Sequence, residues 1–246
     1  MKTPKQIVVF LVLLAPVYGW AADIALGIGG FLTTSPYKVD RDDHSVWPVI
    51  NYDDDTWYIQ GDDAGRYLMN DDANELKLKA FFLDQEYKSS RGSTTAMRRL
   101  NDRRSTVMSG ISYQRTTPIG AVHVQLAGDI LNNSQGVLAN ISYLNQVRLG
   151  MLTVIPEFGV DGANGQQTRY YYGVSSMEAR RSGLSEYRPS ANITPYVSLT
   201  ADYKLSERWD TYASARGNFL PSTVRDSPMV DGDEIYAFSL GINYNF

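Results

Sequence analysis

Apolar and polar residues alternate along most of the chain that follows residue 22. The stretch NELKLKAFF carries Leu76, Leu78, Ala80 and Phe82 on one row and Lys77 and Lys79 on the other. A strict period of two predicts β-strands with one apolar and one polar face. Helical periodicity is nearly absent, and only SSMEARRSGL, residues 175–184, is compatible with a short helix.

This alternation predicts about twelve strands. We expect them at residues 23–31, 46–52, 56–61, 65–70, 75–87, 105–115, 120–130, 137–145, 150–160, 192–203, 209–219 and 235–246.

The predicted connections differ in length according to the side on which they lie. Short turns such as DDD, NDDAN, TTPI, NQVR and KLSER lie on one side, and long links such as 32–45, 88–104, 161–191 and 220–234 lie on the other. Outer-membrane barrels have short periplasmic turns and long outer loops, whereas a soluble sandwich has no reason to sort its loops. We therefore predict an all-β fold, an antiparallel transmembrane β-barrel.

Aromatic residues cluster at the ends of these predicted strands, as expected of rings that lie at the two membrane interfaces. They include Trp57, Tyr58, Tyr113, Tyr143, Tyr187, Tyr196, Tyr203, Trp209, Phe219, Tyr236, Tyr244 and Phe246. A Tyr-rich soluble sheet is the alternative.

The first residues have the pattern of a secretory signal peptide. Lys2 and Lys5 precede a short apolar run, and small residues follow at Gly19 and Ala21. We expect residues 1–21 to be the signal peptide, with cleavage after Ala21 or Ala22, and residues 22–246 to form the barrel.

The chain finishes on the alternating stretch FSLGINYNF, which places Leu240, Ile242, Tyr244 and Phe246 on its apolar row. Outer-membrane barrels resemble one another in such a terminal strand with a final Phe. The resemblance implies that these four residues form the signal read by the barrel assembly machinery. We expect this strand to pair with residues 24–28 and close the barrel.

Longer stretches narrow the resemblance to one family. RRLNDRRSTVMSGISY, YYYGVSSMEARRSGLSEYRP and TVRDSPMVD are similar to the MipA/OmpV family, and the likeness covers essentially all of residues 22–246. It implies the outer membrane of a Gram-negative bacterium. It also implies a scaffold that links a murein lytic transglycosylase to a penicillin-binding synthase in cell-wall growth. The alternative is a narrow porin-like channel for small polar solutes.

The sequence offers little catalytic or metal-binding chemistry. His44 lies beside Asp42 and Asp43 in a predicted loop, where a solvated charge cluster is the better interpretation than a His–Asp couple. The Asp pairs of the short turns lack the spacing of a calcium loop and suit turn capping. We expect a non-enzyme with no cofactor. The mildly acidic balance, a formal charge of −4, argues against a nucleic-acid partner.

Charged residues on the polar rows and in the long loops suggest two further roles. Candidates for the lumen or a plug loop are Lys77, Lys79, His123, Asp129, Arg180, Arg181, Asp202 and Arg216. The basic stretch 88–104 offers Arg98, Arg99, Arg103 and Arg104 as contacts for lipopolysaccharide phosphates, or as partners of lumen carboxylates. The loop 161–191 is either a plug or a surface recognition loop.

Overall fold

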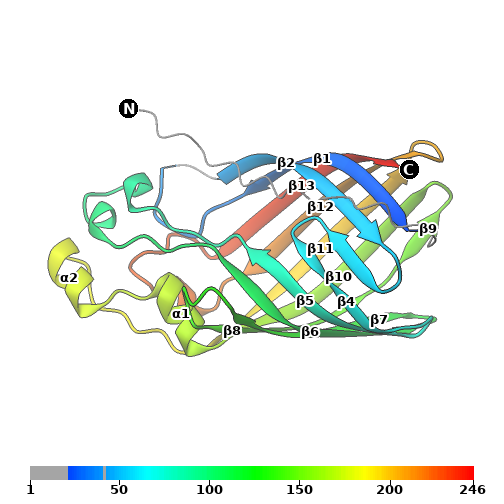
Figure 1. Ribbon diagram of the computed structural model, residues 1–246. Coiled ribbons are helices and arrows are strands. Elements are labelled where there is room, and N and C mark those ends of the chain that lie inside the picture. Colours follow the sequence, from blue (N-terminus) through cyan, green and yellow to red (C-terminus); the bar gives the residue numbers. More distant parts are fainter. Residues whose placement is uncertain (1–21, 41–42) are drawn as a thin grey trace.

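The computed structural model describes residues 22–40 and 43–246, and the predicted signal peptide lies outside them. Its strands form one closed antiparallel barrel (Figure 1). The strands are β1 (Asp23–Thr33), β2 (Asp43–Asp53), β3 (Trp57–Gln60), β4 (Asp63–Asn70), β5 (Asn74–Leu83), β6 (Thr106–Thr117), β7 (Gly120–Asp129), β8 (Val137–Leu144), β9 (Val147–Leu149), β10 (Leu152–Ala163), β11 (Asn192–Lys204), β12 (Trp209–Phe219) and β13 (Glu234–Asn245).

The structure has thirteen strand segments among the described residues, but β8 and β9 occupy one position in the ring. The barrel therefore has twelve strand positions, which confirms the predicted number. Both β8 and β9 pair with β10, β8 through residues 157–163 and β9 through residues 152–154. The predicted turn at NQVR is wrong, since the chain reverses at Gly150, whose φ is 66°.

Pro156 explains the break between β8 and β9. Its carbonyl accepts from the Asn145 N–H at 3.1 Å, so its nitrogen faces the same neighbour but has no hydrogen to donate. The ladder is interrupted at that point and resumes at Val154, opposite Val147.

The ring closes between β13 and β1, as the sequence predicts. Ile28 is opposite Ile242 and Leu26 is opposite Tyr244. The Phe246 N–H donates to the Ile24 carbonyl at 3.0 Å, and the Phe246 ring packs edge-on against Tyr244.

The apolar rows of the strands face outward. Leu26, Leu78, Val124 and Leu240 are all exposed on the barrel wall, where lipid covers such residues in an outer-membrane barrel. Among the described residues, no helix is both long and apolar enough to cross a membrane.

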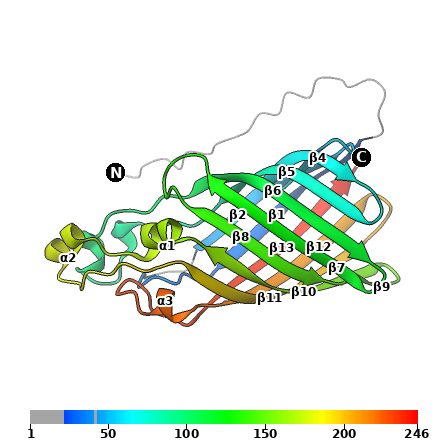
Figure 2. The same cartoon turned by 90° about the horizontal axis from the view of Figure 1, so that it is seen from below.

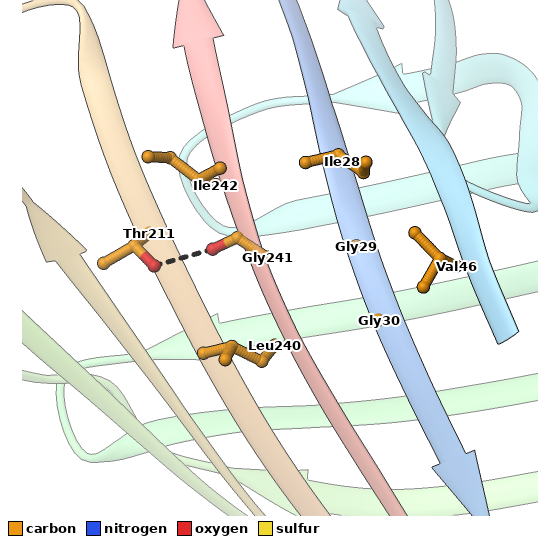
Figure 3. Close-up of a pocket in the computed structure, with 8 residues that line it drawn as sticks. All are labelled: Ile28, Gly29, Gly30, Val46, Thr211, Leu240, Gly241 and Ile242. Atoms are coloured by element: carbon orange, nitrogen blue, oxygen red, sulfur yellow. Dashed lines mark hydrogen bonds between the residues drawn. The ribbon is translucent and has the colours of Figure 1, made fainter. Parts of the chain in front are cut away.

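A shallow apolar groove of about 340 Å³ crosses this outer wall at the closing seam (Figure 3). Ile28, Val46, Leu240 and Ile242 line it, and the Thr211 hydroxyl donates to the Gly241 carbonyl at 2.6 Å. A Cβ on Gly30 would meet only one carbonyl oxygen, at 3.9 Å, so the missing side chain leaves the wall indented at that point.

The outer half of β2 is an unpaired edge among the described residues. β3 pairs with β2 only through Asn51–Asp53, and the β3–β4 hairpin turns at Gly61, whose N–H donates to the Ile50 carbonyl. Strand alternation then points the backbone groups of His44, Val46 and Pro48 toward this open side. Pro48 has no N–H to offer there, which is how natural edges limit unwanted pairing.

The long connections gather at one end of the barrel, opposite the short turns (Figures 1 and 2). Their helical segments are η1 (Ser89–Arg91), η2 (Met97–Arg99), α1 (Gly165–Tyr172), α2 (Ser176–Ser182) and α3 (Ser222–Arg225). The helix expected at 175–184 is confirmed as α2, whereas α1 and α3 have no clear helical pattern in the sequence. We call residues 34–40, 84–105, 164–191 and 220–233 the outer cap.

The outer cap has a hydrophobic core of its own. Its buried side chains come from all four segments: Tyr37, Tyr87, Met97, Leu100, Tyr171, Tyr172, Val174, Leu220, Val224, Met229 and Val230. Isolated bridges join Tyr37 to Val230 and Val39 to Gly92, so separate loops are tied together by backbone hydrogen bonds. The long loops therefore form one packed layer at the outer end of the barrel.

Candidate functional site

Three regions carry the polar and apolar groups with which this barrel can bind partners: the lumen, the outer cap and the inner rim formed by the short turns. Each is built from residues that the β-barrel topology brings together from distant parts of the sequence.

The lumen has a basic and acidic cluster on β3–β5. Lys77 pairs with Glu75 at 2.7 Å and lies 4.5 Å from the centre of the Tyr58 ring, while Lys79 pairs with Asp63. Tyr58 donates to Asp63 at 3.0 Å. These groups neutralise one another, as buried charges require.

A second network crosses β7, β8 and β10–β12. Arg216 pairs with Asp161 and lies 3.5 Å from the centre of the Tyr196 ring. Tyr196 donates to Glu157 at 2.6 Å, and the Asn140 amide donates to Asp161 at 2.8 Å. His123 lies 3.3 Å from the Asn140 oxygen, which makes it a member of this network.

The other lumen candidates lie near the ends of the strands. Asp129 accepts from the Thr106 hydroxyl at 2.5 Å and from the Ser134 N–H at 2.6 Å, and so organises the turn that follows β7. Asp202 lies on the inner half of β11, opposite Tyr212.

Arg180 and Arg181 lie on α2 in the outer cap, away from the strands (Figure 1). Both are exposed, and Arg181 donates to the Asn101 side chain at 2.8 Å. Residues 164–191 of this predicted loop therefore belong to the cap, whereas residues 161–163 are the end of β10.

The arginines of segment 88–104 have different surroundings. Arg98 donates to the Gly92 carbonyl at 2.8 Å, and Arg99 donates to the Arg181 carbonyl at 3.3 Å. Arg104 is exposed, and its backbone N–H donates to the Tyr170 hydroxyl. Arg103 is buried and pairs with Glu178 at 2.9 Å, so its charge is already matched inside the cap.

Glu178 is a residue that our sequence analysis missed. Its signal was the spacing Ser175–Glu178, a capping box that starts α2. Burial alone would raise the pKa of Glu178, but hydrogen bonds from Asn101 and Ser175 and the nearby Arg103 charge lower it to about 2.

The cap holds a pocket of about 440 Å³ beside this ion pair. The residues that line it include Asn101, Asp102, Arg103, Arg169, Tyr170, Ser175, Glu178, Tyr187 and Arg188.

The inner rim consists of five short turns. Two consecutive turns are acidic, and their Asp54 and Asp71 carboxylates accept from nearby backbone N–H groups, Trp57 at 2.6 Å and Asn74 at 2.8 Å. The hydrogen bond from the Trp57 N–H is the main cause of the lowered pKa of the Asp54 carboxyl. The hydrogen bonds from the Ala73 and Asn74 N–H groups lower the pKa of the Asp71 carboxyl in the same way. The Asp-rich turns therefore have the capping geometry that the sequence indicated.

The next three turns around the ring expose apolar side chains. We call Ile119, Leu149, Met151 and Leu205 the apolar rim; their exposed fractions run from 49% to 75%. Sequence analysis missed this set because its four residues are divided among three turns, and only the ring order brings these turns together.

The hypothetical His–Asp couple at His44 falls partly outside the described residues. His44 is exposed on β2, while Asp42 lies outside the described residues. In the part of the chain that the structure describes, no group of three or more His, Asp or Glu side chains could hold a metal ion.

Comparison with known proteins places the chain in a family. The family described as MltA-interacting protein MipA matches residues 26–246. The chain is 40% identical over 223 residues to the MltA-interacting protein of Escherichia coli K12, which covers 90% of each chain. It is 34% identical over 226 residues to the putative outer membrane protein YiaT of the same strain, which covers 92% of each.

A solved structure, the NanC porin, aligns with 90% of this chain and 100% of its own at a TM-score of 0.46 and 7% identity. The family match and the two relatives, together with the closed barrel, establish that this chain is an outer-membrane β-barrel of the MipA family.

Proposed function

We propose that this barrel is an adaptor whose inner rim binds cell-wall enzymes in the periplasm, a murein lytic transglycosylase and a penicillin-binding synthase. The observation that carries the proposal is the apolar rim, which lies next to two acidic turns. The name of the 40% identical relative, MltA-interacting protein, supports a transglycosylase as one partner.

The rim has the composition of a docking surface. Ile119 is 75% exposed at a turn tip beyond Tyr143, whose hydroxyl donates to the Ile119 carbonyl. Met151 and Leu205 belong to the next two turns. When a partner covers apolar side chains at turn tips, their removal from water stabilises the complex. The neighbouring carboxylates favour a partner with a basic patch.

Binding of a soluble murein transglycosylase to the barrel in lipid nanodiscs tests this proposal. We expect saturable binding that Met151→Ser combined with Leu205→Ser weakens about tenfold, because the contact loses apolar area. Asp55→Asn with Asp72→Asn should slow association at low salt, since both side chains are exposed.

Met177→Ser is the matched control. Met177 is 68% exposed, but it lies on α2 at the opposite end of the molecule. Two results would count against the adaptor role. One is that Met177→Ser weakens transglycosylase binding as much as the Met151→Ser, Leu205→Ser double variant does, and the other is that the wild-type barrel does not bind.

A narrow channel for small polar solutes is the second candidate. The charged lumen walls favour it, in particular the ion pairs of Lys79 with Asp63 and of Arg216 with Asp161. Planar-bilayer recording tests the channel. A stable conductance whose ion selectivity changes in Arg216→Gln supports it, and the absence of any stable conductance excludes it.

A further inference from the structure

The pocket on the outer cap has features of a binding site that are separate from the inner rim. It is formed where segment 101–103 meets α1, the start of α2 and residues 187–188. Its volume of about 440 Å³ is in the range of small-molecule sites in proteins.

The carboxylates beside the pocket are already satisfied. Glu178 accepts from Arg103 at 2.9 Å and from the Asn101 N–H at 3.0 Å through Oε1, and from the Ser175 N–H and hydroxyl through Oε2. Asp102 accepts from the Ser89 N–H at 2.8 Å and the Ser89 hydroxyl at 2.7 Å. These hydrogen bonds and the Arg103 charge compensate both negative groups.

Arg103 lines the pocket but is engaged within the cap. It is only 7% exposed, its Nη atoms donate to Glu178 and to the Asn101 and Gly173 carbonyls, and its Nε is buried. The donors that a ligand can reach therefore come from the exposed arginines of the pocket.

Two further guanidinium groups lie at the pocket. Arg169 is exposed, and no carboxylate of the described chain pairs with its side chain. Arg188 pairs with Glu186 at 2.7 Å, but both side chains are exposed and such a pair is weak. The pocket therefore presents a surplus of positive charge and of N–H donors.

The remaining lining suits a sugar ring. Tyr170 and Tyr187 contribute aromatic surface, and their hydroxyls are engaged elsewhere, with Arg104 N–H and the Thr223 carbonyl. The Asn101 side-chain amide adds N–H donors that can hydrogen-bond a hydroxyl, whereas the Ser175 hydroxyl is engaged with Glu178. A flat apolar side chain beside polar groups matches a molecule with both apolar and hydroxyl-bearing faces.

We propose that this pocket binds an anionic saccharide, a sugar that carries a phosphate or a carboxylate. The anion contacts Arg169 and Arg188, and the ring lies against the tyrosines. The site belongs to the cap, which lies at the end of the barrel opposite the short turns (Figure 2), and the long loops of outer-membrane barrels are extracellular.

Isothermal titration of the purified full-length barrel in detergent tests the proposal. The probes are glucosamine 1-phosphate, glucuronate, N-acetylglucosamine and inorganic phosphate. We expect one or both anionic sugars to bind more tightly than inorganic phosphate, N-acetylglucosamine to bind weakly, and affinity to fall as salt rises. Tighter binding of glucosamine 1-phosphate or of glucuronate shows whether the pocket recognises a sugar phosphate or a sugar carboxylate.

The variant Arg169→Gln with Arg188→Gln removes two exposed charges without touching the buried ion pair. We expect it to lose about tenfold in affinity, the usual scale for charge-assisted hydrogen bonds. The matched control is Arg180→Gln, an exposed arginine of α2 that does not line the pocket.

Three results would overturn the proposal: no binding of either anionic sugar, equal affinity for inorganic phosphate, or the same loss in Arg180→Gln as in the pocket variant. An unchanged thermal melting curve in all variants shows that the affinity differences come from the pocket itself.

Discussion

Arg103 Nη2 lies 2.9 Å from Glu178 Oε1, and this contact joins two segments that are 75 residues apart in the chain. Arg103 also donates to the Asn101 and Gly173 carbonyls, at 2.9 and 3.0 Å. Both side chains are buried, at 7% and 3% exposure. The pair therefore fixes how the basic segment and α2 pack in the outer cap.

Glu178→Ala should destabilise the outer cap. It leaves Arg103 as a buried charge without its carboxylate, which typically costs about 3–5 kcal/mol. Limited proteolysis in detergent should show faster cleavage at residues 84–105 and 164–191, while the barrel fragment persists. Glu186→Gln is the control, because it breaks an exposed pair worth about 0–1 kcal/mol.

Replacing both members, Arg103→Met with Glu178→Leu, should restore most of the protease resistance, since an apolar pair of similar volume avoids the desolvation of two charges. A double variant that is as fragile as Glu178→Ala would show that the hydrogen bonds to the backbone, rather than the charge pairing, hold the cap together.

Acid should loosen the cap before it affects the barrel. The pKa of Glu178 is lowered from 4.5 to about 2 in the folded protein, so its contribution is complete above pH 4.5 and is lost as the pH falls toward 2. Asp102 acts in the same direction, because its hydrogen bonds from Ser89 lower its pKa too.

Hydrogen exchange between pH 5 and pH 2, corrected for the intrinsic exchange rate, measures this effect. We expect the protection of Tyr187 and Val174 amides, which bond each other's carbonyls at 2.9 Å, to fall across this range. Protection that stays constant down to pH 2 would contradict the role assigned to Glu178.

The open edge of β2 predicts an alternation in amide protection. Trp47 and Val49 are opposite Gly29 and Gly27, and their N–H groups point toward β1, whereas those of His44 and Val46 point to the open side. Exchange measured by NMR in detergent should be slow at Trp47 and Val49 and fast at His44 and Val46. Equal protection at all four positions would show that another segment covers this edge.

Deletion of Phe246 should impair insertion into the outer membrane while export and signal cleavage continue. Its N–H bonds Ile24 and its ring contacts Tyr244, so one residue joins the closing strand to β1. Heat-modifiable migration of the outer-membrane fraction on gels measures correct assembly. Phe246→Tyr, which keeps the ring and the backbone, serves as the control, and normal assembly of the deletion would refute the prediction.

The sequence by itself determined the number of strands, their pairing order and the sidedness of their loops. Alternation with a period of two fixes which face of each strand is apolar, and short turns force neighbouring strands to pair. The lumen positions of Lys79 and Arg216 follow from the same alternation.

Only the tertiary structure decided how the long loops fold. The cap core unites Tyr37, Tyr87, Tyr172 and Val230 from four segments, and no local pattern reports contacts between residues so far apart. The sequence left open whether Arg103 contacts lipopolysaccharide phosphates or pairs with lumen carboxylates, and the structure instead pairs it with Glu178 of the cap. The apolar rim was hidden for the same reason: residues in three separate turns become one surface only when the barrel closes and sets those turns side by side.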